Sequence, residues 1–147
     1  MSNPGPATTV STHPSNLATN QALRVIAVAK GVNLANLGDT AVPVLNSSSY
    51  APATVITANA NNSGSAVASI SSIYLGVYPA PSQGGSSVLT AAALASNSAT
   101  TDVKVVASSH PAAAQTAQTL YVNVATATVS GTVDVYVYGY DLSGPQQ

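Results

Sequence analysis

The clearest pattern along the chain is the alternation of apolar and polar residues within short segments that end at turn residues. In residues 132–142, three valines alternate with Asp134 and three tyrosines, and residues 72–78 and 120–125 alternate in the same way. A period of two places alternate side chains on opposite faces of a strand. Each of these segments is therefore predicted to be a β-strand with one buried face.

Five further strands are predicted from shorter apolar runs bounded by Gly, Pro, Asn and Ser. They are residues 23–29, 41–45, 53–60, 88–94 and 102–107. Pro43 favours an edge strand or a bulge, because proline cannot donate a ladder hydrogen bond. The alanine-rich run 88–94 fits either a strand or a short helical turn. About eight strands without helical crossovers predict an all-β fold, an antiparallel β-sandwich or jelly-roll-like single domain over residues 21–147.

The segment before this domain, residues 1–20, is predicted to be an extended N-terminal arm. Pro4, Pro6 and Pro14 oppose regular helix, and the other residues are small and polar apart from His13 and a few apolar side chains. One interpretation is a frayed terminus. The other is an arm that lies on a neighbouring subunit, in which these three prolines and His13 would contact the partner.

The composition adds an unusual scarcity of charge. Only 5% of the residues are charged, the formal net charge is −1 and 46% of the residues are apolar, whereas an ordinary soluble domain has about 25% charged residues. Such a chain has no field to attract nucleic acid or an anionic membrane, so neither is an expected partner. Few charges are a solubility liability for a free monomer. The composition therefore favours a surface partly covered by partner subunits over one hydrated only by Ser, Thr, Asn and Gln.

A search for catalytic or metal-binding groups finds almost nothing. The chain has no Cys and no Glu, and its four Asp residues lie far apart in the sequence. Both His13 and His110 precede proline in segments expected to be exposed. The Gly84-Gly85 pair has no following lysine, so it predicts a turn with positive φ rather than a phosphate loop. We therefore predict no enzyme activity, cofactor, metal or small-molecule substrate.

The sequence was also searched for a secretory signal and for a membrane-spanning helix. Residues 1–16 show no secretory signal, and no apolar run reaches the roughly 20 residues of a membrane helix. The chain is therefore expected to be made in the cytoplasm.

The tyrosine row of the last predicted strand is the main candidate for binding. Tyr136, Tyr138 and Tyr140 would share one face. They could form a subunit interface, where tyrosine is enriched, or stack on a sugar. They could also pack on tyrosines of a neighbouring strand, for which the candidates are Tyr74, Tyr78 and Tyr121. Arg24 is a further interface candidate. A lone charge in a neutral interface more often fixes how the two partners are aligned than how tightly they bind.

Several stretches together resemble the capsid decoration, or cement, proteins of tailed bacteriophages. They are the GDTAVPV run at 38–44, the strand at 50–59, residues 73–78 followed by Gly84-Gly85, LYV at 120–122 and VDVYVYGYDL at 133–142. The resemblance covers roughly residues 21–142. It implies a β-sandwich or jelly-roll homotrimer on the outer surface of the virion, where it clamps neighbouring major capsid protein subunits. It supplies no catalytic residues.

Two other functions stay open at this stage. The chain could be a different component of the phage particle, in the tail, the baseplate or a head fibre, because composition does not separate these positions. It could also be a carbohydrate-binding β-sandwich that uses the tyrosine row.

Overall fold

The computed structural model describes residues 23–59, 73–94, 103–105, 114–126 and 131–143, and within them every regular element is a strand. The predicted arm lies outside the described residues. The strands are β1 (Arg24–Asn33), β2 (Gly38–Pro43), β3 (Tyr50–Asn59), β4 (Tyr74–Tyr78), β5 (Leu89–Ala93), β6 (Val103–Val105), β7 (Thr119–Thr126) and β8 (Thr132–Asp141). Each of the eight predicted strands is present, and the ambiguous run at 88–94 is a strand.

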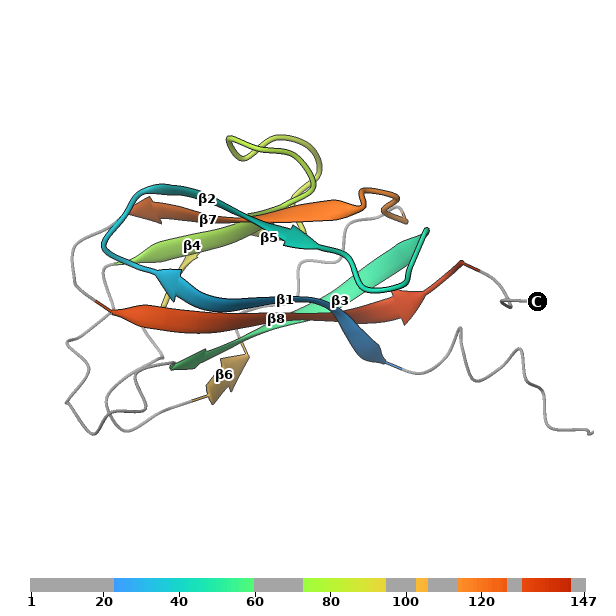
Figure 1. Cartoon of the computed structure of the whole chain (residues 1–147), viewed down its shortest axis with the longest axis horizontal. Helices are drawn as coiled ribbons and strands as arrows, with labels where there is room; N and C mark the ends of the chain where they lie inside the picture. Colours follow the sequence, from blue (N-terminus) through green and yellow to red (C-terminus); the bar gives the residue numbers. More distant parts are fainter. Residues whose placement is uncertain (1–22, 60–72, 95–102, 106–113, 127–130, 144–147) are drawn as a thin grey trace, which may run out of the picture.

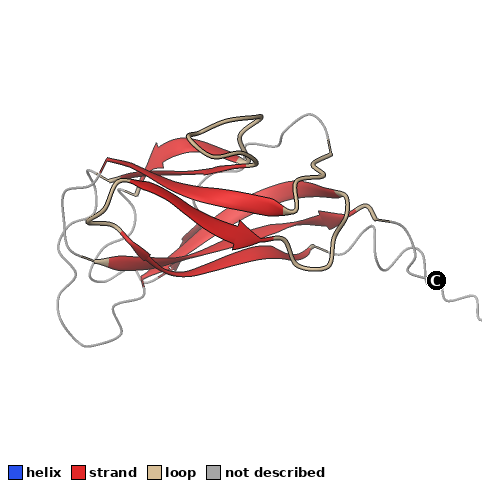
Figure 2. Cartoon of the chain, turned by 45° about the horizontal axis from the view of Figure 1, so that its top comes forward, coloured by secondary structure: helices blue, strands red, loops and turns tan. Residues whose placement is uncertain are grey.

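The strands form two antiparallel sheets, ordered β1-β8-β3-β6 and β2-β7-β4-β5, and Figures 1 and 2 show the sheets stacked as two layers. The first strand pairs with the eighth, the second with the seventh, the third with the sixth and the fourth with the fifth. This is the pairing of a long hairpin rolled into a jelly roll. The predicted all-β antiparallel sandwich is therefore confirmed.

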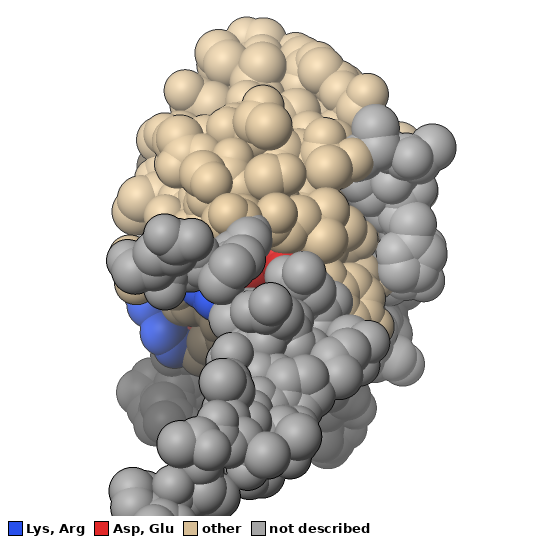
Figure 3. Space-filling view, turned by 90° about the vertical axis from the view of Figure 1, so that its right-hand side faces the viewer, with Lys and Arg blue, Asp and Glu red and all other residues tan. Residues whose placement is uncertain are grey.

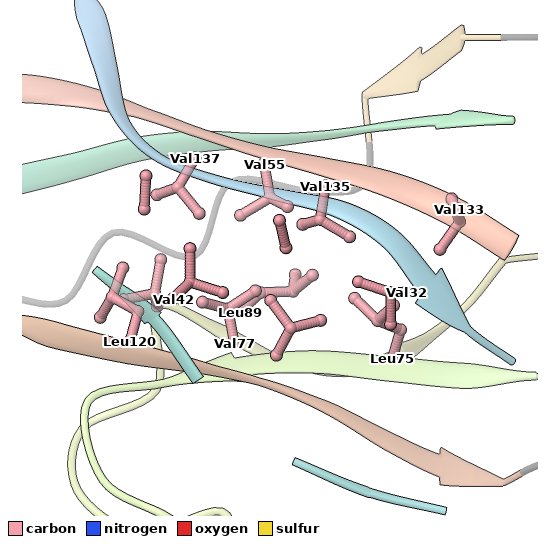
Figure 4. Packing of buried hydrophobic residues seen from close by; sticks show 14 of the residues in the cluster. Val32, Val42, Val55, Leu75, Val77, Leu89, Leu120, Val133, Val135 and Val137 are labelled. Atoms are coloured by element: carbon pink, nitrogen blue, oxygen red, sulfur yellow. The ribbon is translucent and has the colours of Figure 1, made fainter. Parts of the chain in front are cut away.

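The core lies between the two sheets and contains aliphatic side chains with one tyrosine. Val55, Val133 and Val135 project from one sheet towards Leu75 and Val77 of the other (Figure 4). All five are at most 1% exposed. Burial of such a side chain contributes about 1.5–3 kcal/mol, so the valine-rich alternation of the sequence is what holds the two layers together.

Three strand boundaries differ from the prediction by three residues or more. β1 continues to Asn33 instead of ending at residue 29, and β2 begins at Gly38 instead of residue 41. β3 begins at Tyr50, three residues before the predicted start at residue 53. Tyr50 is fully buried, and its hydroxyl donates a hydrogen bond to the Ala117 carbonyl over 2.8 Å. Burial raises the pKa of Tyr50 to about 12.

The two prolines of the early strands occupy different positions. Pro43 lies on β2, at the edge of its sheet, as predicted. Pro52 lies on β3, between β8 and β6, beside an irregularity of register. Its partner there is Gly139, which has no side chain: a Cβ on Gly139 would come within 2.4 Å of the Ala51 carbonyl oxygen. β6 pairs with β3 only at residues 56–58, so Pro52 lies beside a bulge on a part of β3 that β6 does not reach, where proline is tolerated.

Candidate interaction surface

The outward side of the sheet β1-β8-β3-β6 carries the predicted tyrosine row. On β8 the valines at 133, 135 and 137 point into the core, so the alternate residues point away from it. Tyr136 and Tyr138 are half-buried, and Tyr140 is 38% exposed. Their cross-strand neighbours complete a surface that we call the tyrosine face: Val25 and Val28 on β1, and Ala51, Thr54 and Ile56 on β3.

Of the three interpretations of this row, cross-strand packing against Tyr74, Tyr78 or Tyr121 is wrong. Tyr74, Tyr78 and Tyr121 belong to β4 and β7, which are in the other sheet, and there Tyr78 pairs with Tyr121. The sequence shows which residues alternate, but the jelly-roll order decides which strands become neighbours. The row at 136–140 is therefore flanked by aliphatic residues and threonine, whose side chains are shorter than tyrosine and project less far from the sheet.

One end of the tyrosine face carries a charged pair. Lys30 Nζ lies 2.8 Å from Asp134 Oδ2, contacts the Tyr136 hydroxyl and sits 4.4 Å from the centre of the Tyr136 ring. Hydrogen bonds to Asp134 and Tyr136 raise the pKa of Lys30. Burial alone raises the pKa of Asp134, but hydrogen bonds from Lys30 and the Gly31 amide outweigh it and hold that pKa below its ordinary value.

Arg24 lies at the opposite end of the sheet and is also paired. Its guanidinium donates to Asp141 over 2.7 Å and to the carbonyls of Leu45 and Asn46 over 3.3 Å. Ser143 donates to Asp141 from its hydroxyl over 2.6 Å and from its amide over 3.0 Å. These bonds tie the end of β8 to the start of β1 and to the connection between β2 and β3. Arg24 is thus not the isolated interface charge that the sequence predicted.

The same end of the molecule exposes large apolar side chains. Arg24 pairs with Gly139, so the register places Leu23 opposite Tyr140. Leu142 continues the two-residue period of the tyrosine row, and its amide donates to the Ser49 carbonyl over 2.8 Å. Leu23 is 49% exposed and Leu142 is 41% exposed. Neither residue was predicted from the sequence, although the two-residue spacing of Leu142 from Tyr140 places both on one face.

Charged side chains occupy little of the described surface that is visible from this end. Figure 3 shows a described surface made mainly of other residues, with only small areas of Lys or Arg and of Asp or Glu. The charged side chains that the structure describes are each bonded within the chain: Arg24, Lys30, Asp39, Asp134 and Asp141. Little charge in the described part is therefore left to attract or orient a partner.

The outward side of the other sheet is organised differently, because the loop between β4 and β5, residues 79–88, folds over it (Figure 1). Asp39 on β2 accepts hydrogen bonds from the Ser82 amide over 2.7 Å and from the Asn123 side chain over 2.6 Å. Gln83 donates to Asn123 over 2.9 Å. Asn123 is 6% exposed, so this loop buries a polar side chain and satisfies it. We call this surface the covered face.

The loop turns sharply at its tip. Ser82 and Gln83 have φ angles of 56° and 61°, and Gly84 donates to the Pro81 carbonyl over 3.1 Å. Positive φ at two successive residues is the pattern of a type I′ turn, which usually uses Asn or Gly. The predicted positive φ at the glycine pair is confirmed at Gly85, with φ 79°, but the turn itself precedes it. Bonds to Asp39 and Asn123 hold this strained turn in place.

The four arm residues proposed as partner contacts, Pro4, Pro6, His13 and Pro14, lie outside the described residues, as does His110. Asp39 and Asp134 lie on different sheets, so they form no acidic pair. Within the described ranges, no three His, Cys, Asp or Glu residues come together as a metal site. No helix among those residues is long and apolar enough to cross a membrane.

Comparisons with known proteins add no relative: the chain matches no family model, no curated protein and no solved structure.

Proposed function

We propose that the chain is a structural protein of a bacteriophage particle, which binds the outer surface of the icosahedral capsid as a homotrimer and bridges major capsid protein subunits. The observation that supports this most is the combination of a jelly roll with a described surface whose charges are all bonded within the chain. Jelly rolls recur in viral capsid and lectin domains. A neighbour can bury a neutral surface without leaving an unpaired charge at the interface. Burying an unpaired charge carries a large free-energy penalty.

The lattice supplies the binding strength in this proposal. Each copy would make modest apolar contacts, and a trimer engages several capsid subunits at once, so the contacts reinforce one another through effective concentration. Because these contacts involve few charges, they should be screened little by salt.

Co-sedimentation tests this function. The protein is mixed with empty shells assembled from the major capsid protein of the same genome, and the pellet is quantified at about 0.1 M and about 1 M NaCl, where the Debye length falls from about 10 Å to about 3 Å. We expect saturable binding at a fixed ratio to the capsid subunit and less than about a twofold loss at high salt. Binding no greater than to shells of an unrelated phage would overturn the proposal.

Labelling of intact particles locates the protein. Antibody-bound gold on the head supports the proposal, whereas gold confined to the tail, the baseplate or a fibre would assign the chain to another particle component.

A second candidate function, carbohydrate binding, is favoured by the exposed Tyr140 beside two further outward tyrosines. Sugar sites combine an aromatic platform with free polar partners. On the described part of the tyrosine face, Lys30 and Asp134 are bonded to each other, which leaves few polar partners. A glycan array distinguishes this candidate: binding lost in Tyr140→Ala would support it, and no binding would remove it.

A further inference from the structure

The tyrosine face continues without a charged outward side chain from the middle of β8 to the end of the sheet. Tyr136, Tyr138, Tyr140 and Leu142 follow one another at two-residue spacing. The six residue-to-residue steps from Tyr136 to Leu142 span about 20 Å. Leu23 lies opposite Tyr140 and widens this apolar row at its end. The covered face has its own loop above it, and the tyrosine face receives no hydrogen-bonded cover from the described loops.

We propose that the tyrosine face binds residues 1–22 of a second copy of this chain. This segment contains Pro4, Pro6 and Pro14 and no Asp, Glu, Lys or Arg. Proline-rich segments bind aromatic-lined surfaces in the polyproline II conformation, because the ring is apolar and little conformational entropy is lost. An uncharged segment can also be buried on a neutral face without desolvating a charge.

The dimensions of the segment fit the face. Polyproline II rises about 3.1 Å per residue, so about seven residues cover the 20 Å row. The 22 residues before Leu23 could extend about 70 Å in that conformation. The segment is therefore long enough to leave one molecule and lie along the face of another.

The direction of β1 favours a second copy over the same molecule. β1 starts at the exposed end of the tyrosine face, opposite the end of β8, and runs from Leu23 back along that face through Val25 (Figure 1). At Leu23 the chain direction, followed towards the N-terminus, points off the end of the face. Binding its own face would require a complete reversal at this point. Binding the face of a neighbour placed beyond this end requires none.

This inference concerns the assembly of the chain with itself and adds to the proposed function, but it does not depend on binding to a capsid. The test therefore uses the full chain in solution without shells. The arm inference can fail while shells are still bound, and it can hold if they are not.

Disulfide trapping tests the inference cleanly, because the chain has no cysteine. Full-length Thr9→Cys is mixed with full-length Thr54→Cys, whose new thiol lies beside Tyr138 on the tyrosine face. The matched control mixes Thr9→Cys with Ala41→Cys, an exposed outward position on the other sheet. The reactivity of each single thiol towards a soluble reagent is measured first and used to normalise the yields. After mild oxidation, mass spectrometry of the linked peptides quantifies each disulfide.

In these mixtures, a disulfide from position 9 to position 54 joins two molecules by construction. We expect its normalised yield to exceed that of the control by about tenfold, and Pro4→Ala/Pro6→Ala/Pro14→Ala in the Thr9→Cys chain to lower it towards the control. Equal yields at positions 54 and 41 would overturn the inference. So would a link found only within single molecules of the double variant Thr9→Cys/Thr54→Cys, because that result assigns the arm to its own face.

Discussion

The two outward faces of the sandwich are built from the same kinds of residue but differ in how far the chain's own described loops cover them. On the sheet β2-β7-β4-β5, the chain's own loop at 79–88 is held by Asp39 and Asn123, and Tyr78 is 5% exposed, although Tyr74 at the start of β4 stays 45% exposed. On the sheet β1-β8-β3-β6, Tyr140 keeps 38% of its surface exposed beside Leu142. A tyrosine buried by its own chain supports folding, whereas one left exposed at an apolar end is available to a partner.

Truncating one tyrosine on each face should give the largest contrast. Tyr78→Ala is expected to lower the free energy of unfolding by about 3–4 kcal/mol, because it empties a buried site. Tyr140→Ala is expected to lower it by about 1 kcal/mol or less. Urea unfolding followed by circular dichroism measures both.

The concentration dependence of the melting temperature sharpens this contrast. If the tyrosine face binds another copy, the melting temperature of the unmodified protein rises with protein concentration, and Tyr140→Ala reduces that rise while Tyr78→Ala keeps it. Equal losses of stability in the two variants, with no effect on concentration dependence, would contradict the distinction between the faces.

Gly76 should be the next most sensitive position, again on the covered face. Its missing side chain makes room for the Tyr78 ring: a Cβ would lie 2.5 Å from ring atom Cε2 and 3.0 Å from the Ala91 amide nitrogen. The Tyr78 hydroxyl accepts a hydrogen bond from that amide over 3.1 Å. Gly76→Ala is expected to destabilise the protein by about 2 kcal/mol, because the ring must move.

A double-mutant cycle checks the cause. In the Tyr78→Ala background, the ring is gone and Gly76→Ala should cost less than about half as much as it does alone. A cost that is unchanged in that background would assign the effect to the backbone near Ala91 instead of the ring.

The carboxylates of the two faces provide a smaller contrast. Asp39→Ala removes the acceptor for Ser82 and for the buried Asn123, so it is expected to cost about 1–2 kcal/mol. Asp134→Ala breaks a pair whose lysine partner is 61% exposed, and should cost less than Asp39→Ala. Hydrogen exchange at the Ser82 amide should accelerate in the first variant and stay unchanged in the second. The reverse order of stabilities would show that the loop is held by other contacts.

The strands were predictable because their chemistry is local. The alternation of valine with polar residues in 132–142 identifies the longest strand and its buried side, and both are confirmed by the burial of the three valines. Tyrosine and valine at strand spacing form a pleated, half-buried surface in almost any sheet. The fold class followed from the number and spacing of such segments.

What the sequence could not supply was the pairing between distant strands. Lys30 meets Asp134 across 104 positions of sequence and Arg24 meets Asp141 across 117. These contacts depend on β1 and β8 becoming neighbours, which a single chain pattern does not specify. For the same reason the sequence could not show that Tyr74, Tyr78 and Tyr121, the candidate neighbours of the tyrosine row, belong to the other sheet. The hydrogen bond from the Ser82 amide in the loop at 79–88 to Asp39 could not be predicted either, because it also joins distant parts of the chain.

The smallest expected effect concerns pH at the open end of the tyrosine face. Burial alone raises the pKa of Asp141, but hydrogen bonds from Ser143 and the charge of Arg24 outweigh it and hold that pKa below its ordinary value. A carboxylate with a lowered pKa in the folded state adds stability that is present above its unfolded pKa of about 3.9. This stability is lost as the pH falls from that value through the lower pKa of the folded state.

Ser143→Ala removes the 2.6 Å bond from the hydroxyl to Asp141 and brings the folded pKa closer to the unfolded one. At pH 6 the variant should be less stable by about 1 kcal/mol. This difference should shrink as the pH falls below about 3.9 and through the lowered folded pKa, because Asp141 then becomes protonated in both proteins. Urea unfolding at pH 6 and over that acidic range measures it, with Ser86→Ala in the exposed loop as the control. A difference independent of pH would assign the role of Ser143 to the bonds that its hydroxyl accepts from the Ser48 and Ser49 amides, instead of to Asp141.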